Sequence, residues 1–442
     1  MTAFLLFFTR LCHTFMYLCR LYIISTSKAR PSMHYTLRAP DHIDTVIQLP
    51  SSKSISNRVL IMNQLSGSKM QLDNLSDCDD TRVMLKALNN RSEITDIHAA
   101  GTAMRFLTAY YASTDNRTIL TGTERMKHRP ISILVETLQG LGADIQYMDK
   151  KGFPPLRISG RRLAGGETTL PGNVSSQYIS ALMMIAPYME NGLKIHIEGD
   201  IISQSYIVLT MELMKLFGAK ISQEGDRTLN IQPSTYTGGA FTVESDWSAA
   251  SYWYEIVALA PGSDHSVELP HLHHDSLQGD SQVSRLFEPL GVRTTYRDNA
   301  VRLSKGGARC ETYEADLSNQ PDLAQTIVVT CAMLKIPFHI TGLQTLRIKE
   351  TDRIKALVTE LRKLGVNLQK KNGDTLIWNG KTETPEASPM IDTYEDHRMA
   401  MAFAPCAFSH ERLSINNPEV VSKSYPHFWK DLLHAGFTIL NE

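Results

Sequence analysis

Five charged side chains crowd the seven residues from position 347 to position 353. They are Arg347, Lys349, Glu350, Asp352 and Arg353. Apolar residues at helical spacing follow, so the pattern predicts a helix over about 350–364 whose first turn lies in the charged stretch. Helix starts carry unpaired backbone N–H groups that favour anions. The stretch is therefore a candidate anion site, although taken alone it is more typical of a solvated helix start.

A helix that ends near a glycine and is followed by a strand-like segment recurs along the chain. The glycines, each at a position that favours a left-handed helix cap, are Gly142, Gly218, Gly291, Gly365 and Gly436. By subtraction their spacings are 76, 73, 74 and 71 residues. A weaker sixth copy, over 81–88, lacks the glycine. This period is too long for a solenoid turn. It predicts six small α/β modules, three in each of two domains.

Each module also carries a second helix that starts with small polar or charged residues. These starts lie at Ser52, Gly101, Ser175, Asp246, Pro321 and Asp396. One such start is ordinarily only a capped helix, since Ser, Thr and Asp are preferred caps. Three of the six also bring Arg or Lys in the first turns. If the modules place these ends together, the result is a pocket for a ligand with several phosphates or carboxylates.

Composition narrows the functional classes. A chain of 442 residues supports two or three domains, and a formal net charge of -1 gives no general attraction to nucleic acid or to a membrane. Six cysteines, without CxxC or zinc-type spacing, are expected to be reduced thiols in a cytoplasmic protein. The metal-like residues at 271–275 are expected to form a polar loop, so we expect neither a metal nor a cofactor.

Residues 1–33 differ from the rest of the chain. Apolar residues there are interrupted by Arg10 and Arg20, no run reaches the roughly 18 residues of a spanning helix, and no clean cleavage pattern follows. A targeting segment is one interpretation. An upstream extension before a functional chain that starts near Met33 is the one we favour.

Several stretches resemble the signatures of the enolpyruvyl transferases, in particular the branch whose acceptor is shikimate 3-phosphate. They follow in the family order from about Ala39 to Phe437: LPSSKSISNR at 49–58, AGTAMR at 100–105, RMKHRP at 125–130, VSSQ at 174–177, the stretch 347–353 and DHRMA at 396–400. The resemblance implies an α/β fold of two similar domains, each with three βαβαββ-type modules in an inside-out barrel. The active site would lie in the interdomain cleft.

The same resemblance implies domain boundaries. Residues 34–51 and 244–442 would form a discontinuous first domain and residues 52–243 the second, so the chain would cross twice between them. A monomer is expected. Closure on the first substrate is a further hypothesis, because cationic side chains come from both domains.

The implied reaction transfers the enolpyruvyl group of phosphoenolpyruvate to the 5-hydroxyl of shikimate 3-phosphate by addition and elimination, on the route to chorismate and aromatic amino acids. Shikimate 3-phosphate would be held by Lys53, Ser54, Arg58, Ser175, Ser176, Gln177, Ser203, Tyr206, Asp322 and Lys349. Phosphoenolpyruvate would be held by Lys53, Gly101, Arg129, Gln177, Arg353, Arg398 and Lys423. Arg and Lys suit its phosphate and carboxylate, and Arg can bind either in a bidentate manner.

An acid and a base are also needed. We assign Asp322 to the hydroxyl proton and Glu350 to carbon C3, with Lys53 as a charged partner or alternative acid. Three positions depart from the family pattern, namely Ala99, Phe106 and Thr345. They bear on the shape of the phosphate pocket, on one substrate contact and on the response to the family's inhibitor glyphosate.

Two other functions fit part of the sequence pattern. A sister enzyme transfers enolpyruvyl to UDP-N-acetylglucosamine, but it uses a Lys-Asn pair and a reactive loop cysteine, whereas Lys53 precedes Ser54 here and no cysteine lies between 79 and 309. A non-catalytic homologue that binds anions is the other alternative. Its mark would be the loss of a catalytic group, and none is lost.

Overall fold

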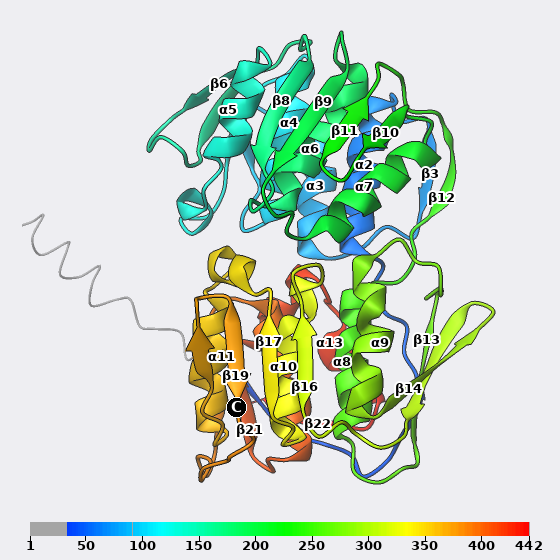
Figure 1. The fold of residues 1–442 in the computed structure, drawn as a ribbon, viewed down its shortest axis with the longest axis vertical. Coiled ribbons are helices and arrows are strands. Elements are labelled where there is room, and N and C mark those ends of the chain that lie inside the picture. The colour runs from blue at the N-terminus through cyan, green and yellow to red at the C-terminus, as the bar shows by residue number, and fades with distance from the viewer. Residues whose placement is uncertain (1–32, 91, 442) are drawn as a thin grey trace, which may run out of the picture.

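The computed structural model describes residues 33–90 and 92–441, which form two lobes (Figure 1). Each lobe has its own hydrophobic core. One core collects buried side chains from Leu37 to Leu49 and from Trp247 to Phe437. The other collects those from Ile55 to Val243. We therefore propose domain boundaries at the two predicted crossings. The predicted extension, apart from Met33, lies outside the described residues.

The two crossings lie side by side. Ser51 and Ser245 form an isolated antiparallel bridge. The Ser52 amide donates to the Glu244 carbonyl over 2.8 Å, and the Asp246 amide donates to the Pro50 carbonyl over 2.9 Å. The backbone of both connections is thus satisfied where the chain passes between the lobes.

Six sheets occur in the described part of the chain, three in each lobe. Those of the upper lobe in Figure 1 are β4-β5-β7-β6, β10-β11-β9-β8 and β12-β3. Their strands are β3 (Met70–Asp73), β4 (Ile94–Asp96), β5 (Arg117–Thr121), β6 (Asp144–Tyr147), β7 (Leu156–Ser159), β8 (Gly166–Pro171), β9 (Leu193–Glu198), β10 (Ile221–Glu224), β11 (Thr228–Ile231) and β12 (Gly239–Thr242).

The lower lobe holds the sheets β14-β15-β13-β2, β16-β17-β19-β18 and β20-β21-β1-β22. Their strands are β1 (His34–Arg38), β2 (Ile43–Val46), β13 (His265–Pro270), β14 (Val292–Arg297), β15 (Ala300–Lys305), β16 (Tyr313–Asp316), β17 (Phe338–Thr341), β18 (Gln369–Lys371), β19 (Thr375–Trp378), β20 (Met390–Ile391), β21 (Leu413–Asn416) and β22 (Thr438–Asn441).

The four-stranded sheets share one pairing scheme. Each sheet has one parallel pair and two antiparallel pairs of strands. In the first sheet β4 pairs with β5 in parallel, whereas β7 pairs with β5 and with β6 in an antiparallel manner. The sixth sheet has only the parallel pair of β12 and β3. It belongs to the module that contains the weak sixth copy. The missing glycine therefore coincides with a module that lacks the antiparallel pair.

The marker glycines confirm the predicted helix ends. All five have positive φ, between 79° and 99°, which non-glycine residues rarely adopt. The helices that precede them are α5 (Ser132–Gly140), α7 (Gln204–Leu216), α9 (Val283–Phe287) with a 3₁₀ turn, α11 (Arg353–Lys363) and α13 (Phe428–His434). The helix of the sixth copy is α3 (Asp79–Asn89).

The second helix of each module is almost wholly buried. These helices are α2 (Lys53–Leu65), α4 (Gly101–Ser113), α6 (Ser176–Ile185), α8 (Trp247–Leu259), α10 (Ala324–Met333) and α12 (His397–Phe403). A helix that is buried on nearly all sides lies in the centre of a domain. In each lobe the amphipathic helices and the sheets surround them. Among the described residues, no helix combines the length and the apolar character needed to cross a membrane.

One predicted boundary was wrong. Helix α11 begins at Arg353, not near 350, and the Asp352 side chain accepts the Lys355 amide over 3.0 Å as its cap. Aspartate is a preferred cap residue. A 3₁₀ turn over Gln344–Ile348 precedes it, so Lys349 and Glu350 lie in the connection between the two.

Candidate active site

A cavity of about 250 Å³ lies between the lobes and is lined from both sides. The upper lobe contributes the starts of α2, α4 and α6. The lower lobe contributes the 3₁₀ turn at Pro321–Leu323 before α10, the connection before α11 and the start of α12. Five of the six helix starts that the sequence singled out therefore meet at this cavity, whereas the start of α8 at Asp246 does not line it.

Arg353 is the centre of the charged groups on the lower wall. Its side chain is 1% exposed and contacts three carboxylates. Nε and Nη2 bind the two oxygens of Asp396 over 2.7 and 3.2 Å. Nη2 also donates to Glu350 over 3.1 Å, and Nη1 to Asp322 over 3.2 Å. A buried guanidinium thus fixes both proposed proton-transfer groups relative to the cap of α12.

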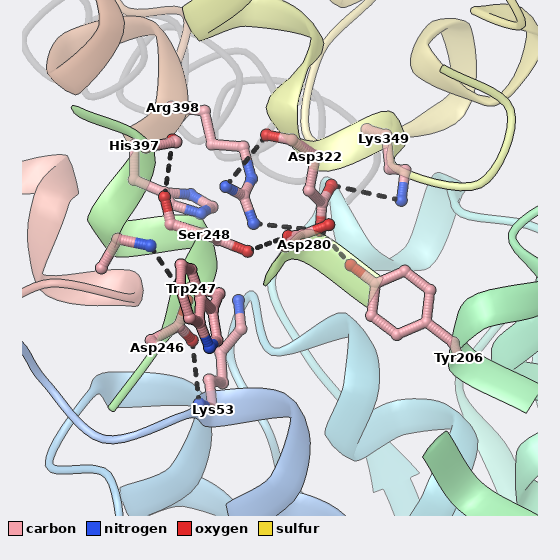
Figure 2. Close-up of polar contacts among 12 residues, drawn as sticks. Lys53, Tyr206, Asp246, Trp247, Ser248, Asp280, Asp322, Lys349, His397 and Arg398 are labelled. Carbon is pink, nitrogen blue, oxygen red and sulfur yellow. Dashed lines mark hydrogen bonds and ion pairs between the residues drawn. The ribbon is translucent and has the colours of Figure 1, made fainter. Parts of the chain in front are cut away.

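Asp322 is surrounded by cations (Figure 2). Arg398 Nη2 lies 2.9 Å from Asp322 Oδ2, and Lys349 Nζ lies 3.7 Å from Oδ1. The Tyr206 hydroxyl, from the other lobe, donates to Oδ2 over 3.0 Å. Burial alone would raise the pKa of Asp322, but the neighbouring Arg and Lys groups hold that pKa well below its usual range. Asp322 is therefore ionised and can accept a proton.

Glu350 has an equally cationic setting. Lys423 Nζ lies 2.9 Å from Oε1, and Arg129, from the other lobe, lies 3.9 Å from the same oxygen. Burial opposes ionisation, yet Lys423, Arg353 and Arg129 hold the pKa of Glu350 well below its usual range. The side chain is ionised while no anion competes for these cations.

Lys53 sits at the start of α2, 3.8 Å from Asp80. Burial lowers the pKa of Lys53, but Asp80 and the Cys78 thiol outweigh burial and raise that pKa above its usual value. Lys53 is thus a persistent cation. This favours the role of charged partner over that of acid.

Comparisons with known proteins show the family of this chain. The sequence model of EPSP synthase (3-phosphoshikimate 1-carboxyvinyltransferase) matches residues 37–91 and 88–432. The 3-phosphoshikimate 1-carboxyvinyltransferase of Bacteroides fragilis (strain YCH46) is 56% identical over 407 residues, which cover 92% of this chain and 99% of that one. The chain belongs to the EPSP synthase family.

More distant relatives agree. The enzyme of the same name from Photobacterium profundum is 35% identical over 425 residues, covering 90% of this chain and 97% of that one. A solved EPSP synthase from Acinetobacter baumannii has a TM-score of 0.75 at 20% identity, covering 93% of this chain and 100% of that one. The fold class predicted from the sequence is confirmed.

Nearly all of the site residues predicted from this family line the cavity. From the upper lobe these are Lys53, Ser54, Arg58, Gly101, Arg129, Ser175, Ser176, Gln177, Ser203 and Tyr206. From the lower lobe they are Asp322, Lys349, Glu350, Arg353 and Arg398. Lys423 does not line this cavity but contacts Glu350 behind it. The geometry thus brings the set together, while the role of each member stays a prediction.

Arg58 and Phe106 show what one departure from the family pattern does. Arg58 donates to Thr210 over 2.7 Å and to the Ser54 carbonyl over 2.9 Å. Its guanidinium lies over the Phe106 ring, 5.4 Å from the centroid. Burial lowers the pKa of Arg58 to about 10, so it remains charged at neutral pH. Phe106 thus packs against Arg58, which is predicted to hold shikimate 3-phosphate.

Gly101 lies where two arginine side chains come close to the backbone. A Cβ there would lie 2.6 Å from Arg129 Nη1 and 2.9 Å from Arg105 Nη1. Arg105 donates to the Gly101 carbonyl over 2.9 Å. In the described chain, the buried Nε atoms of Arg105 and Arg129 have no hydrogen-bond partner. Two guanidinium groups thus meet a bare backbone, as an anion site requires.

Other residues that line the cavity were not among the predicted ligands. They include Asp80, Arg105 and His397, together with Thr345, one of the departures from the family pattern. Arg105 could have been found from its position one turn after Gly101. Thr345 Oγ1 is buried without a partner among described residues. In the described part of the chain, no group of three or more His, Cys, Asp and Glu side chains is arranged to hold a metal ion.

Proposed function

We propose that this protein transfers the enolpyruvyl group of phosphoenolpyruvate to the 5-hydroxyl of shikimate 3-phosphate and releases phosphate. The observation that carries the proposal is the cavity between the lobes. There, cations from both sides surround two ionised carboxylates, Asp322 and Glu350. Two polyanionic substrates need such a site, and the 56% identical relative has the name of this activity.

In the proposed mechanism Asp322 acts as the base. It takes the proton of the 5-hydroxyl while the oxygen attacks carbon C2 of phosphoenolpyruvate. Carbon C3 receives a proton from Glu350 and becomes a methyl group. In the second step Glu350 takes a proton back from C3, and the electron pair of that C–H bond forms the double bond between C2 and C3. The bond from C2 to the phosphate oxygen breaks, and phosphate leaves with its electron pair.

Glu350 must be protonated to act as the acid, and its setting suggests how. Its pKa is low because Lys423, Arg353 and Arg129 neutralise its charge. Phosphoenolpyruvate would bring a phosphate and a carboxylate to the same cations. The Glu350 carboxylate would then share its cations with other anions, and its pKa would rise. Binding of the substrate would thus load the proton donor.

We further propose that the lobes close around the substrates. Contacts across the cavity include the Tyr206 hydroxyl with Asp322 and the Ser203 amide with the Ser318 carbonyl at 2.9 Å. Lys423 donates to the Ala99 carbonyl over 3.1 Å. We place the protein in the cytoplasm as a monomer, in keeping with the free thiols of Cys78, Cys310, Cys331 and Cys406.

The test is phosphate release by the purified protein. Phosphoenolpyruvate is supplied with shikimate 3-phosphate or with UDP-N-acetylglucosamine as acceptor. We expect release only with shikimate 3-phosphate, and a loss of about 10²–10⁴-fold in kcat for Asp322→Asn, the usual contribution of a positioned base. Asp226→Asn, in an exposed turn, is the matched control. Release of phosphate with the nucleotide sugar would favour the activity of the sister enzyme. No release with either acceptor would favour a non-catalytic homologue.

A further inference from the structure

A carboxyl group that the mechanism does not use lies beside Asp322. Asp280 is in the 3₁₀ turn Gly279–Gln282 of the lower lobe and is 5% exposed. Its Oδ2 accepts a hydrogen bond from the Ser248 hydroxyl (Figure 2). Its Oδ1 is buried and has no hydrogen-bond partner among the described residues. An unpaired buried carboxyl oxygen costs stability, so its retention calls for a functional reason.

The turn that carries Asp280 is fixed to the crossing between the lobes. The Gln278 side chain donates to Glu244 and to the Ser245 carbonyl, both over 2.8 Å. It also accepts the Trp247 amide over 3.1 Å. These contacts hold the turn on the chain segment that starts α8. Asp280 therefore has one well-defined position relative to Ser248.

The same turn touches the other lobe. A Cβ at Gly279 would lie 2.3 Å from the Ser205 Cβ, at the start of α7. The next residue in α7 is Tyr206, whose hydroxyl donates to Asp322. Glycine at 279 thus allows α7 to come close enough for this contact. The turn that carries Asp280 therefore lies next to the helix whose Tyr206 contacts the proposed base, Asp322.

Charged groups face Asp280 from several elements. Burial and the negative charge of Asp322 raise the pKa of Asp280 to about 7, and Asp246, the cap of α8, adds to the rise. Arg398, from α12, and the Ser248 hydrogen bond act in the opposite direction. Asp280 in turn raises the pKa of Tyr206, from α7. The two carboxyl groups therefore affect each other's proton affinity.

We propose that Asp280 is a positioning residue that acts through Asp322 and strengthens it as a base. The inference rests on the proposed function. Four neighbouring cations stabilise ionised Asp322 and would by themselves make it a poor proton acceptor. A second carboxylate next to it raises its affinity for the hydroxyl proton. That proton moves to Asp322, and the electron pair of the O–H bond forms the new C–O bond. Asp280 does not line the cavity in which the substrates would bind.

The experiment is the pH dependence of kcat and KM between about pH 5.5 and 9. In the unmodified protein we expect kcat to rise through about pH 7, where Asp280 gains its charge. Asp280→Asn should remove that rise and lower kcat about tenfold at about pH 8, the effect of one pKa unit at Asp322. Both KM values should change less than about threefold, because no substrate contact is lost. Asp298→Asn, an exposed residue of the same lobe, is the control.

A second variant keeps the test decisive if Asp280→Asn does not fold. Ser248→Ala removes the hydrogen bond that lowers the pKa of Asp280, so the rise in kcat should move to higher pH and reach the same plateau. An Asp280→Asn enzyme with an unchanged pH profile, or with raised KM and normal kcat, would overturn the proposal. So would an unshifted profile in Ser248→Ala. No turnover by the unmodified protein would instead remove the proposed function, and this inference with it.

Discussion

Replacing Arg353 by lysine tests how the active site holds its two proton-transfer groups. Lysine keeps the buried positive charge but loses the planar fork that binds Asp396, Glu350 and Asp322 at once. Hydrogen bonds to charged groups contribute about 1.5–3 kcal/mol each. If the ammonium group of the introduced lysine stays with Asp396, the contacts to Glu350 and Asp322 are lost.

The loss of these two contacts can be expressed as a decrease in kcat/KM. Two misplaced contacts of this kind correspond to about 3 kcal/mol or more, which is roughly a 10²-fold or larger decrease in kcat/KM. The assay is steady-state phosphate release, with urea unfolding alongside it to show that the fold persists. Arg362→Lys, an exposed position of the same helix, should leave kcat/KM unchanged. A folded Arg353→Lys enzyme with kcat/KM within about threefold of the unmodified protein would refute the reasoning.

Two further predictions concern a backbone position and a buried acid. Gly101→Ala should raise the KM for phosphoenolpyruvate about tenfold or more and alter kcat less. The Cβ of the introduced alanine would displace the guanidinium ends of Arg129 and Arg105. Competition binding of phosphoenolpyruvate to the variant measures the loss of affinity. Glu255 is fully buried without a partner for either oxygen among described residues, and burial raises its pKa well above the usual value. The folded protein then keeps a proton that the unfolded chain releases above about pH 4.3, so this group makes the free energy of unfolding fall by about 1.4 kcal/mol per pH unit up to the folded pKa. Urea unfolding at about pH 5, 6 and 7 should show that Glu255→Gln lacks this slope, and equal slopes in both proteins would contradict the assignment.

The repeated pattern explains why so much of the fold could be predicted. A glycine at these helix ends is a local signal, because glycine readily adopts the left-handed conformation that closes the last turn, and the five glycines from Gly142 to Gly436 all adopt it. The spacing of these glycines gave the modules before any contact was known. The boundary of α11 was missed for an equally local reason. Asp352 is the cap of the helix, and the residues from Lys349 to Thr351 lie in the connection that follows the 3₁₀ turn.

The residues of the site also differ in whether a local sequence pattern indicates them. The residues predicted to hold anions stand in short stretches at helix starts. Their types and order in the sequence indicated them, and nearly all of them line the cavity. Asp280 has no such signal. It follows a loop whose position depends on Gln278 contacting a distant segment of the chain, and its proton affinity depends on Asp322 and Arg398 from two other modules. A local pattern can show that a chain carries a base. How strong that base is depends on charges that only the folded chain brings together, and for this reason the pH profile of Asp280→Asn probes what the sequence alone could not reach.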